Sequence, residues 1–313
     1  MSPAASAWGL LFSDGLILNK KGMNDTFRFL DEVKDRLEFV PYDLIYQSIA
    51  DMKDKFVPTA LLKKGWYIDR VRVHKNINEI FTNEHQVSYI HDQEILDNFV
   101  TFGRANKKKQ AVFYGAVETE EIRHPRVVAY FETSDLLKEL DQQENAVELF
   151  TVSRWEILED IEILEMIFSD EALKKSSSTR TSLEHQLNNY KDSPLAKEYE
   201  EQGRFFSNEF ARNDVKKGQE YKYKITAAYA NYIWENPKLK GITYPSVQSD
   251  YKGQNVALLP EIVDKYLKLE FVGIFKFERK AGQNLPVDSI KVATDLGKEN
   301  MEFKWVDYVG SEH

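Results

Sequence analysis

The chain of 313 residues is long enough for one large domain or for two smaller ones. Hydrophobic residues make up 42% of it and charged residues 30%, a balance typical of a folded globular protein rather than a disordered one. The net charge of −9 argues against a general nucleic-acid binder, which needs a positive field to displace counterions from phosphate, but it allows a local basic pocket for one small anion. Cysteine is absent, which excludes disulfides, thiolate metal sites and a cysteine nucleophile.

Membrane, secretory and metal-binding signals are also missing from the sequence. It contains no run of about eighteen apolar residues, so we expect no transmembrane helix and no membrane partner. No basic segment precedes the short apolar stretch at residues 8–12, so we expect no secretory signal and a cytoplasmic location. The six histidines are scattered without an H-x-x-x-H pair, so we expect no metal site.

The N-terminal part of the chain has helical patterns. Residues 24–40 predict an amphipathic helix that ends at Pro41. Residues 44–56 predict a second helix before Pro58. We therefore expect residues 1–64 to form an N-terminal helical region.

Strand-like patterns follow. Residues 66–74 alternate as in a β-strand, which puts Arg70 and Arg72 on one face. Residues 111–116 are short, apolar and aromatic, as in a buried strand, and residues 146–152 predict a further strand.

Between these strands, Pro125 is suited to the first turn of a helix over residues 126–140. In such a helix Val128, Glu132 and Leu136 lie four residues apart, so that a carboxylate falls on an apolar stripe. A buried carboxylate is costly unless it has partners or a chemical role, which makes Glu132 a candidate functional residue.

A long segment after the strand at 146–152 predicts helices. Ser153 and Glu156 form a capping-box signature, which indicates a helix start. Residues 174–182 have the composition of a polar linker, and charged helical sequence continues to about residue 213. We therefore expect residues 153–218 to form a largely helical insertion.

The C-terminal part returns to mixed patterns. Residues 220–235 predict a helix, and strands are expected at 242–244, 256–259 and 269–277. The strands are too irregularly spaced for a doubly wound parallel sheet, so the predicted fold class is α+β.

Four short segments occur in a fixed order along the chain. They are residues 69–73 (DRVRV), residues 103–106 (GRAN) leading into 113–116 (FYGA), residues 129–133 (AYFET), and residues 242–246 (ITYPS) followed by Asn255. This ordered set resembles the RES family, which is named for its arginine, glutamate and serine. The resemblance covers roughly residues 65–140 and 220–277.

The resemblance implies an ADP-ribosyltransferase-like mixed sheet core that binds NAD and breaks the bond between nicotinamide and ribose. Residues 65–313 would then form a RES-like NAD-binding domain, with N-terminal helices before it and the helical insertion inside it. Compact RES members are toxins that deplete NAD and are held in check by an antitoxin. The protein partners to consider are a separate antitoxin and a second copy of the chain in a homodimer. NAD would be a substrate rather than a cofactor.

The family's functional residues carry over position by position. The arginine falls on Arg70, with Arg72 as the alternative, the tyrosine on Tyr114, the glutamate on Glu132, the serine on Ser246 and the asparagine on Asn255, while Arg104 is a second candidate for a phosphate or ribose contact. We expect these residues to meet in one cleft.

The residue types suit the chemistry. The guanidinium group of Arg70 matches the oxygens of a diphosphate bidentately. Loss of nicotinamide passes through an oxocarbenium-like state, which the Glu132 carboxylate would stabilise while accepting a proton. Tyr114 would offer a flat face to the nicotinamide or ribose, and Ser246 a compact donor to the carboxamide or to Glu132.

Each of these residues also has a plain structural interpretation. Arg70 and Arg72 would be solvated surface charges, and Tyr114 a core residue. Glu132 would pair with Arg126 or Lys138, and Ser246 would be a turn residue.

Two other functions would use the same segments. One is ADP-ribosyl transfer to a macromolecule, with the loop at residues 118–126 and the helical insertion as acceptor surface. The other is a non-catalytic module for nucleotide sensing or protein interaction.

Overall fold

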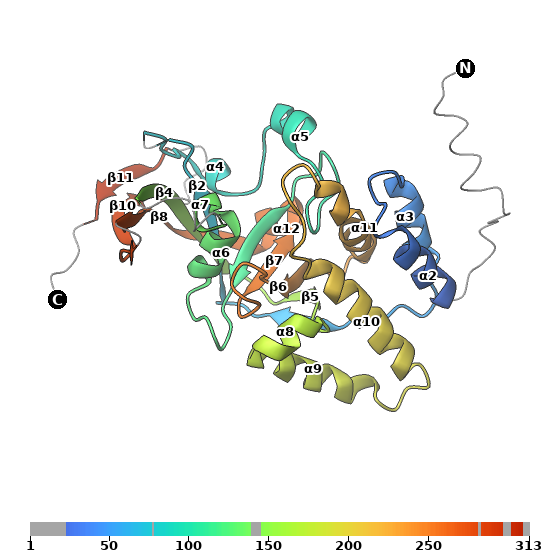
Figure 1. Cartoon of the computed structure of the whole chain (residues 1–313). Coiled ribbons are helices and arrows are strands. Elements are labelled where there is room, and N and C mark those ends of the chain that lie inside the picture. Colours follow the sequence, from blue (N-terminus) through green and yellow to red (C-terminus); the bar gives the residue numbers. More distant parts are fainter. Residues whose placement is uncertain (1–22, 77, 139–144, 281–282, 297–301, 309–313) are drawn as a thin grey trace, which may run out of the picture.

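The computed structural model describes residues 23–76, 78–138, 145–280, 283–296 and 302–308. These residues form an eleven-stranded mixed sheet with helices packed around it (Figure 1), so the predicted α+β class is confirmed. Ten strands follow one another in the order β1 (Thr59–Leu62), β5 (Ile161–Glu165), β6 (Gly241–Pro245), β7 (Gln254–Leu258), β3 (Phe113–Val117), β2 (Tyr67–Val73), β4 (Ala146–Ile157), β8 (Leu267–Lys280), β10 (Asp288–Thr294) and β11 (Lys304–Asp307), and β9 (Gln283–Asn284) pairs with β8. Only the β5–β6 pair among these is parallel.

Helices surround the sheet, and two groups of them can be distinguished. The helices α2 (Met23–Val33) and α3 (Tyr42–Ala50) lie near α11 (Lys224–Ile233), which follows the short helix η1 (Glu220–Tyr223). The helices α8 (Asp170–Lys175), α9 (Ser177–Tyr190) and α10 (Ala196–Phe210) lie together below the sheet in Figure 1. The remaining helices are α4 (Glu84–Val87), α5 (Gln93–Phe99), α6 (Pro125–Thr133), α7 (Asp135–Lys138) and α12 (Pro260–Tyr266). Within the described ranges, no helix combines the length and apolar character that crossing a bilayer requires.

The N-terminal region contains both predicted helices, but both end earlier than the sequence indicates: α3, predicted over residues 44–56, spans Tyr42–Ala50. α2 stops at Val33, not at residue 40, and the chain continues to Pro41 through turns. The reason is tertiary: the buried Lys224 Nζ donates to the carbonyl oxygens of Leu37 and Val40, at 2.6 and 2.7 Å. Further on, the same region supplies β1, which pairs with β5 at one edge of the sheet.

The prediction of a helix starting at Ser153 is wrong, because β4 continues to Ile157 and β5 follows at Ile161–Glu165. The Ser153 hydroxyl does not cap a helix. It donates to the carbonyl oxygen of Val87 and accepts from the indole N–H of Trp155, at 3.0 Å in both cases. Pairing of β4 with β2 on one side and β8 on the other overrides the local capping signal. The helical segment therefore begins only at α8.

Residues 174–182 are also not a linker. They span the end of α8 and the start of α9, and the Ser176 hydroxyl caps α9 by accepting from the backbone N–H of Thr179.

The helix predicted over residues 126–140 is divided in two. α6 ends at Thr133, the chain turns at Ser134, and α7 follows. The buried Ser134 hydroxyl donates to Glu148 at 2.6 Å and accepts from the backbone N–H of Leu137 at 3.1 Å, so it anchors the break. Residues 139 and 140 of the predicted helix lie outside the described residues. As a result, Glu132 stands in the last turn of a short helix.

A separate core beneath α6 holds that helix on the sheet. Val128 and Tyr130 on α6 pack with Val71 of β2 and with Phe150 and Phe275 of β4 and β8, all buried. Burial of such side chains contributes about 1.5–3 kcal/mol each, so the position of α6 on the sheet is strongly determined.

The carboxylate of Asp69 fixes the start of α6. Asp69 lies on β2 and is fully buried. It accepts two hydrogen bonds from the guanidinium group of Arg154 on β4, at 2.7 and 2.8 Å, and one from the backbone N–H of Arg126 at 3.0 Å. One side chain thus joins two strands to the N-terminus of α6, where a negative charge is favourable.

We expect Asp69→Ala to lower the free energy of unfolding by about 3 kcal/mol, because it leaves Arg154 without its counter-charge and removes an acceptor from the first turn of α6. Denaturant unfolding measures the change. Glu171→Ala, which breaks an exposed ion pair with Lys174, is the control and is expected to cost less than about 0.5 kcal/mol. If both variants lost the same small amount of unfolding free energy, Asp69 would not be what fixes the start of α6.

A second carboxylate attaches α9 to the loop that precedes α6. Glu121 accepts hydrogen bonds from the hydroxyls of Ser177 and Ser178, at 2.8 and 2.7 Å, and from their backbone N–H groups. Burial acts to raise the pKa of Glu121, but the hydrogen bonds from Ser178 and Ser177 outweigh it and lower the pKa to about 2. The ionised form is therefore the one that holds α9.

Because the folded state lowers the pKa of Glu121 from 4.5 to about 2, its stabilising contribution is complete above pH 4.5 and declines as the pH falls towards 2. We expect Glu121→Gln to cost about 1 kcal/mol near neutral pH, less than the pKa shift alone implies because water screens this partly exposed carboxylate, with the difference from wild type shrinking across that acid range. Denaturant unfolding at a series of pH values tests this, with Glu118→Gln, an exposed carboxylate on the same loop, as the control. A loss that stays constant with pH would show that the charge of Glu121 is not involved.

Candidate functional site

One cavity of about 530 Å³ collects the residues that the sequence analysis selected. It is lined by Arg70, Arg72, Arg104, Tyr114, Glu132 and Asn255, together with Val71, Val73, Gly115, Ala129, Thr133, Tyr223 and Tyr244. These residues come from β2, β3, α6, β6 and β7 and from the loops around them. Ser246 does not line the cavity but lies directly behind Glu132, to which it is hydrogen bonded.

The carboxylate of Glu132 is held in place by two buried donors. Ser246 Oγ donates to Glu132 Oε1 at 2.6 Å, and Asn255 Nδ2 donates to the same oxygen at 3.0 Å. The predicted ion pair with Arg126 is absent from the described residues, and the side chain of Lys138 lies outside them. At the wall of the cavity, Ser246 and Asn255 thus help to orient Glu132.

The loop after β6 presents Ser246 to Glu132. Ser246 is fully buried, so it is not a simple exposed turn residue. Its backbone N–H donates to the carbonyl of Gly253 at 2.9 Å, and its own carbonyl accepts from the N–H of Tyr251 at 2.9 Å. A Cβ at Gly253 would lie 2.4 Å from Val128 of α6. The glycine thus allows the loop to pack closely against the helix that carries Glu132.

The hydroxyl of Tyr114 holds the G-R-A-N loop. It donates to Asn106 Oδ1 at 2.8 Å and accepts from the backbone N–H of Ala105 at 3.0 Å. Gly103 is required here, because a Cβ at this position would lie 2.2 Å from Asn106 Oδ1. Burial raises the pKa of Tyr114 well above its usual value, so the phenol stays protonated and acts as a donor. Because the loop occupies the hydroxyl, Tyr114 contributes its ring to the lining of the cavity.

The guanidinium group of Arg70 is partly buried and lacks a carboxylate partner. Its Nη1 donates to the carbonyl oxygen of Tyr114 at 2.6 Å, and the group lies 5.4 Å from the ring centre of Phe113. Within the described chain it forms no ion pair, and its buried Nε has no hydrogen-bond acceptor. Burial, with a further contribution from the charge of Arg72, lowers the pKa of Arg70 to about 9. The guanidinium group of Arg70 therefore remains charged at neutral pH, and not all of its hydrogen-bond donors have an acceptor among the described residues.

Arg72 and Arg104 also contribute guanidinium groups to the cavity, and Arg104 makes two hydrogen bonds to the protein where Arg70 and Arg72 make one each. Arg72 donates to the carbonyl oxygen of Gln86, and burial lowers its pKa. Arg104 donates through both Nη atoms, to the carbonyl oxygens of Phe210 at 2.6 Å and Arg212 at 2.9 Å.

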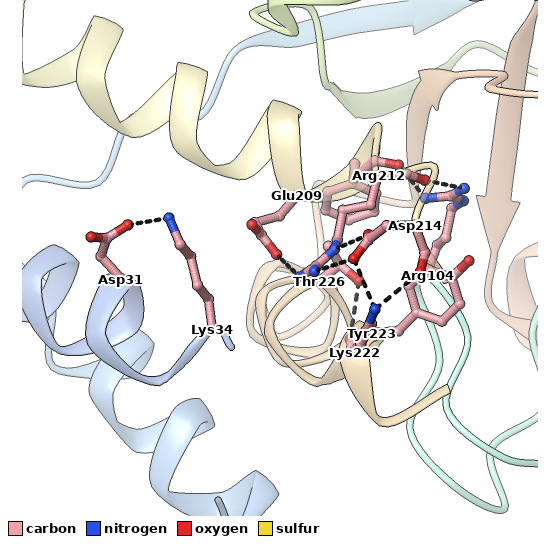
Figure 2. A network of polar contacts seen from close by, with 10 residues as sticks. Asp31, Lys34, Arg104, Glu209, Arg212, Asp214, Lys222, Tyr223 and Thr226 are labelled. Carbon is pink, nitrogen blue, oxygen red and sulfur yellow. Dashed lines mark hydrogen bonds and ion pairs between the residues drawn. The ribbon is translucent and has the colours of Figure 1, made fainter. Parts of the chain in front are cut away.

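Arg104 thereby joins the loop to the end of α10. Figure 2 shows it beside a network in which Arg212 pairs with Glu209 and Asp214, each at 2.9 Å. The guanidinium group of Arg104 lies 5.1 Å from the ring centre of Tyr223. The hydrogen bonds of Arg104 are therefore structural. Arg70, which makes fewer hydrogen bonds to the protein, is better placed than Arg104 to bind an anion.

The cavity is locally positive although the chain carries a net charge of −9. In the part of the chain that the structure describes, none of its three arginines is neutralised by an ion pair; the hydrogen bonds given for them go to carbonyl oxygens. A field of this kind concentrates anions in a cavity.

Two aromatic residues of the cavity were not selected from the sequence. Tyr223 lies in η1, outside every motif, and no pattern in the sequence marks it. Tyr244 is part of the ITYPS segment and is buried against Phe210, with 5.4 Å between the ring centres. The position of Tyr244 between Ile242 and Ser246 was the only signal that could have identified it.

Within the described residues no group of three or more His, Asp or Glu side chains is arranged to hold a metal ion. A scan against protein-family models finds no match to the chain, and a search of curated proteins finds none either.

We expect Arg70→Met to leave the free energy of unfolding unchanged or to raise it by up to about 1 kcal/mol, because it removes a partly buried charge that has no counter-charge. Denaturant unfolding measures the effect. Arg154→Met, which removes the partner of Asp69, is the matched variant and is expected to be destabilising by about 3 kcal/mol. A comparable loss in Arg70→Met would mean that Arg70 has a structural role.

Proposed function

We propose that this protein binds NAD in the cavity of Arg70 and Glu132 and breaks the bond between nicotinamide and ribose, as a RES-type enzyme with an ADP-ribosyltransferase-like sheet. The observation that carries the proposal is the pairing of an oriented carboxylate with an unneutralised guanidinium group in one cavity. The ordered motifs of the sequence lead to the same residues. The volume of about 530 Å³ lies in the range of small-molecule sites.

Arg70 would bind the diphosphate of NAD. Its side chain lines the cavity and its guanidinium group has no carboxylate partner among the described residues, so phosphate oxygens can supply the counter-charge. A guanidinium group binds two phosphate oxygens at once, which fixes the direction of the dinucleotide. The ring of Tyr114 would pack against the nicotinamide or ribose.

Glu132 would act on the glycosidic bond. The electron pair of the broken bond leaves with the ring nitrogen, so that neutral nicotinamide departs and the anomeric carbon becomes an oxocarbenium-like centre. The negative charge of Glu132 stabilises this centre, and its carboxylate accepts the proton released when water or another acceptor adds. Ser246 and Asn255 would keep the carboxylate in place throughout, since both already donate to it.

The direct test is incubation of the purified protein with NAD and quantification of nicotinamide. We expect release that Glu132→Gln reduces by at least about 100-fold. Glu118→Gln alters an exposed carboxylate on the neighbouring loop and serves as the matched control, expected to keep full activity. Circular dichroism of both variants checks that the fold is retained.

Three outcomes separate the alternative functions. Transfer of label from NAD to protein or nucleic acid in a lysate would indicate an ADP-ribosyltransferase. Binding of NAD in calorimetry without nicotinamide release would indicate a nucleotide-sensing module. Neither binding nor release by the folded protein would overturn the proposal. The resemblance further supports a cytoplasmic location and a separate antitoxin as partner.

A further inference from the structure

A second cavity, of about 640 Å³, lies against a different face of α6. It is lined by Arg126, Val127, Tyr130 and Phe131 of α6, by Phe150, Phe275 and Phe277 of the sheet, and by His124, Leu137, Gln248, Asn284 and Val287. The α6 residues of the first cavity are Ala129, Glu132 and Thr133. In a helix of 3.6 residues per turn these two sets point in different directions, so the cavities are separate.

Three of the aromatic rings in the wall of the second cavity are nearly parallel. Tyr130 and Phe150 stack with 4.0 Å between ring centres and 20° between planes. Phe150 and Phe275 continue the series at 5.7 Å and 18°. The Tyr130 hydroxyl donates to Glu148 at 2.7 Å, which fixes the first ring of the series. A flat aromatic ligand would pack against such a wall better than a flexible chain would.

The single arginine of this cavity has no counter-charge. The side chain of Arg126 forms no hydrogen bond or ion pair with the described residues, and its Nε is buried. By contrast, Arg154 nearby is fully paired with Asp69. No acidic residue belongs to the described lining of the cavity, and His124 adds a second basic group. An anionic group on the ligand would therefore complete the hydrogen bonding of Arg126.

We propose that this cavity binds a small, flat aromatic carboxylate. The aromatic part would pack against the rings of Tyr130 and Phe150, and the carboxylate would pair with the guanidinium group of Arg126. The volume is that of a small-molecule site rather than of an extended protein interface. The proposal is independent of NAD cleavage, because Arg126 does not line the first cavity.

Calorimetric titration with 2-naphthoate tests the proposal, and the neutral 2-naphthamide of similar shape isolates the contribution of charge. We expect saturable binding of naphthoate, about tenfold tighter than that of naphthamide. Arg126→Gln should weaken naphthoate binding by about tenfold without affecting naphthamide. Arg123→Gln, an exposed arginine three residues earlier, is the control and should bind as wild type.

Two further variants locate the ligand. Val127→Trp places a bulky group at the partly exposed rim and should abolish binding of both compounds without threatening the core. Arg70→Gln alters only the first cavity and should leave binding intact. Absence of saturable naphthoate binding below about 1 mM would overturn the proposal. So would equal affinity for naphthamide, full binding by Arg126→Gln, or loss of binding in Arg70→Gln.

Discussion

The buried carboxylate of Asp69 is the constraint on which the candidate site depends. It is the residue directly before Arg70 in β2, and it accepts from Arg154 of β4 and from the first turn of α6. Because α6 spans only Pro125–Thr133, fixing its first turn also determines where its last turn and Glu132 lie. The side chain of Asp69 therefore fixes the position of Glu132 on α6 relative to Arg70 on β2.

Four arginines of this acidic protein form two contrasting pairs. Arg154 and Arg212 are bound by carboxylates, and they join elements that are distant in the sequence. Arg70 and Arg126 have no carboxylate partner in the described chain, and each lines a cavity. A partly buried guanidinium group without a counter-charge is unfavourable for folding, so its position in a cavity indicates a role in binding. The net charge of the chain conceals this local arrangement.

The short helix α6 separates the two cavities and contributes a wall to each. Its inner side chains, Val128 and Tyr130, pack on the sheet. Its end is anchored by Ser134, whose hydroxyl donates to Glu148, and the same carboxylate accepts from Tyr130. The two ends of the helix are thus tied to a buried carboxylate on β2 and a partly buried one on β4. A ligand that shifted α6 in one cavity would change the geometry of the other, since the helix has little freedom to bend.

By itself the sequence determined the strands around the site and the residue types within it. The alternation of residues 66–74, the apolar stretch at 111–116 and the ITYPS segment all form strands, because side-chain periodicity is a local property.

Only the tertiary structure decided where elements end. Ser153 and Glu156 belong to a strand because β2 and β8 pair with it, and α2 stops early because Lys224 binds the carbonyl groups beyond it. Likewise, no local pattern reveals that Ser246 and Asn255 both donate to Glu132, or that the guanidinium group of Arg126 has no partner among the described residues. Those facts depend on which distant segments meet, and short-range periodicity does not encode that.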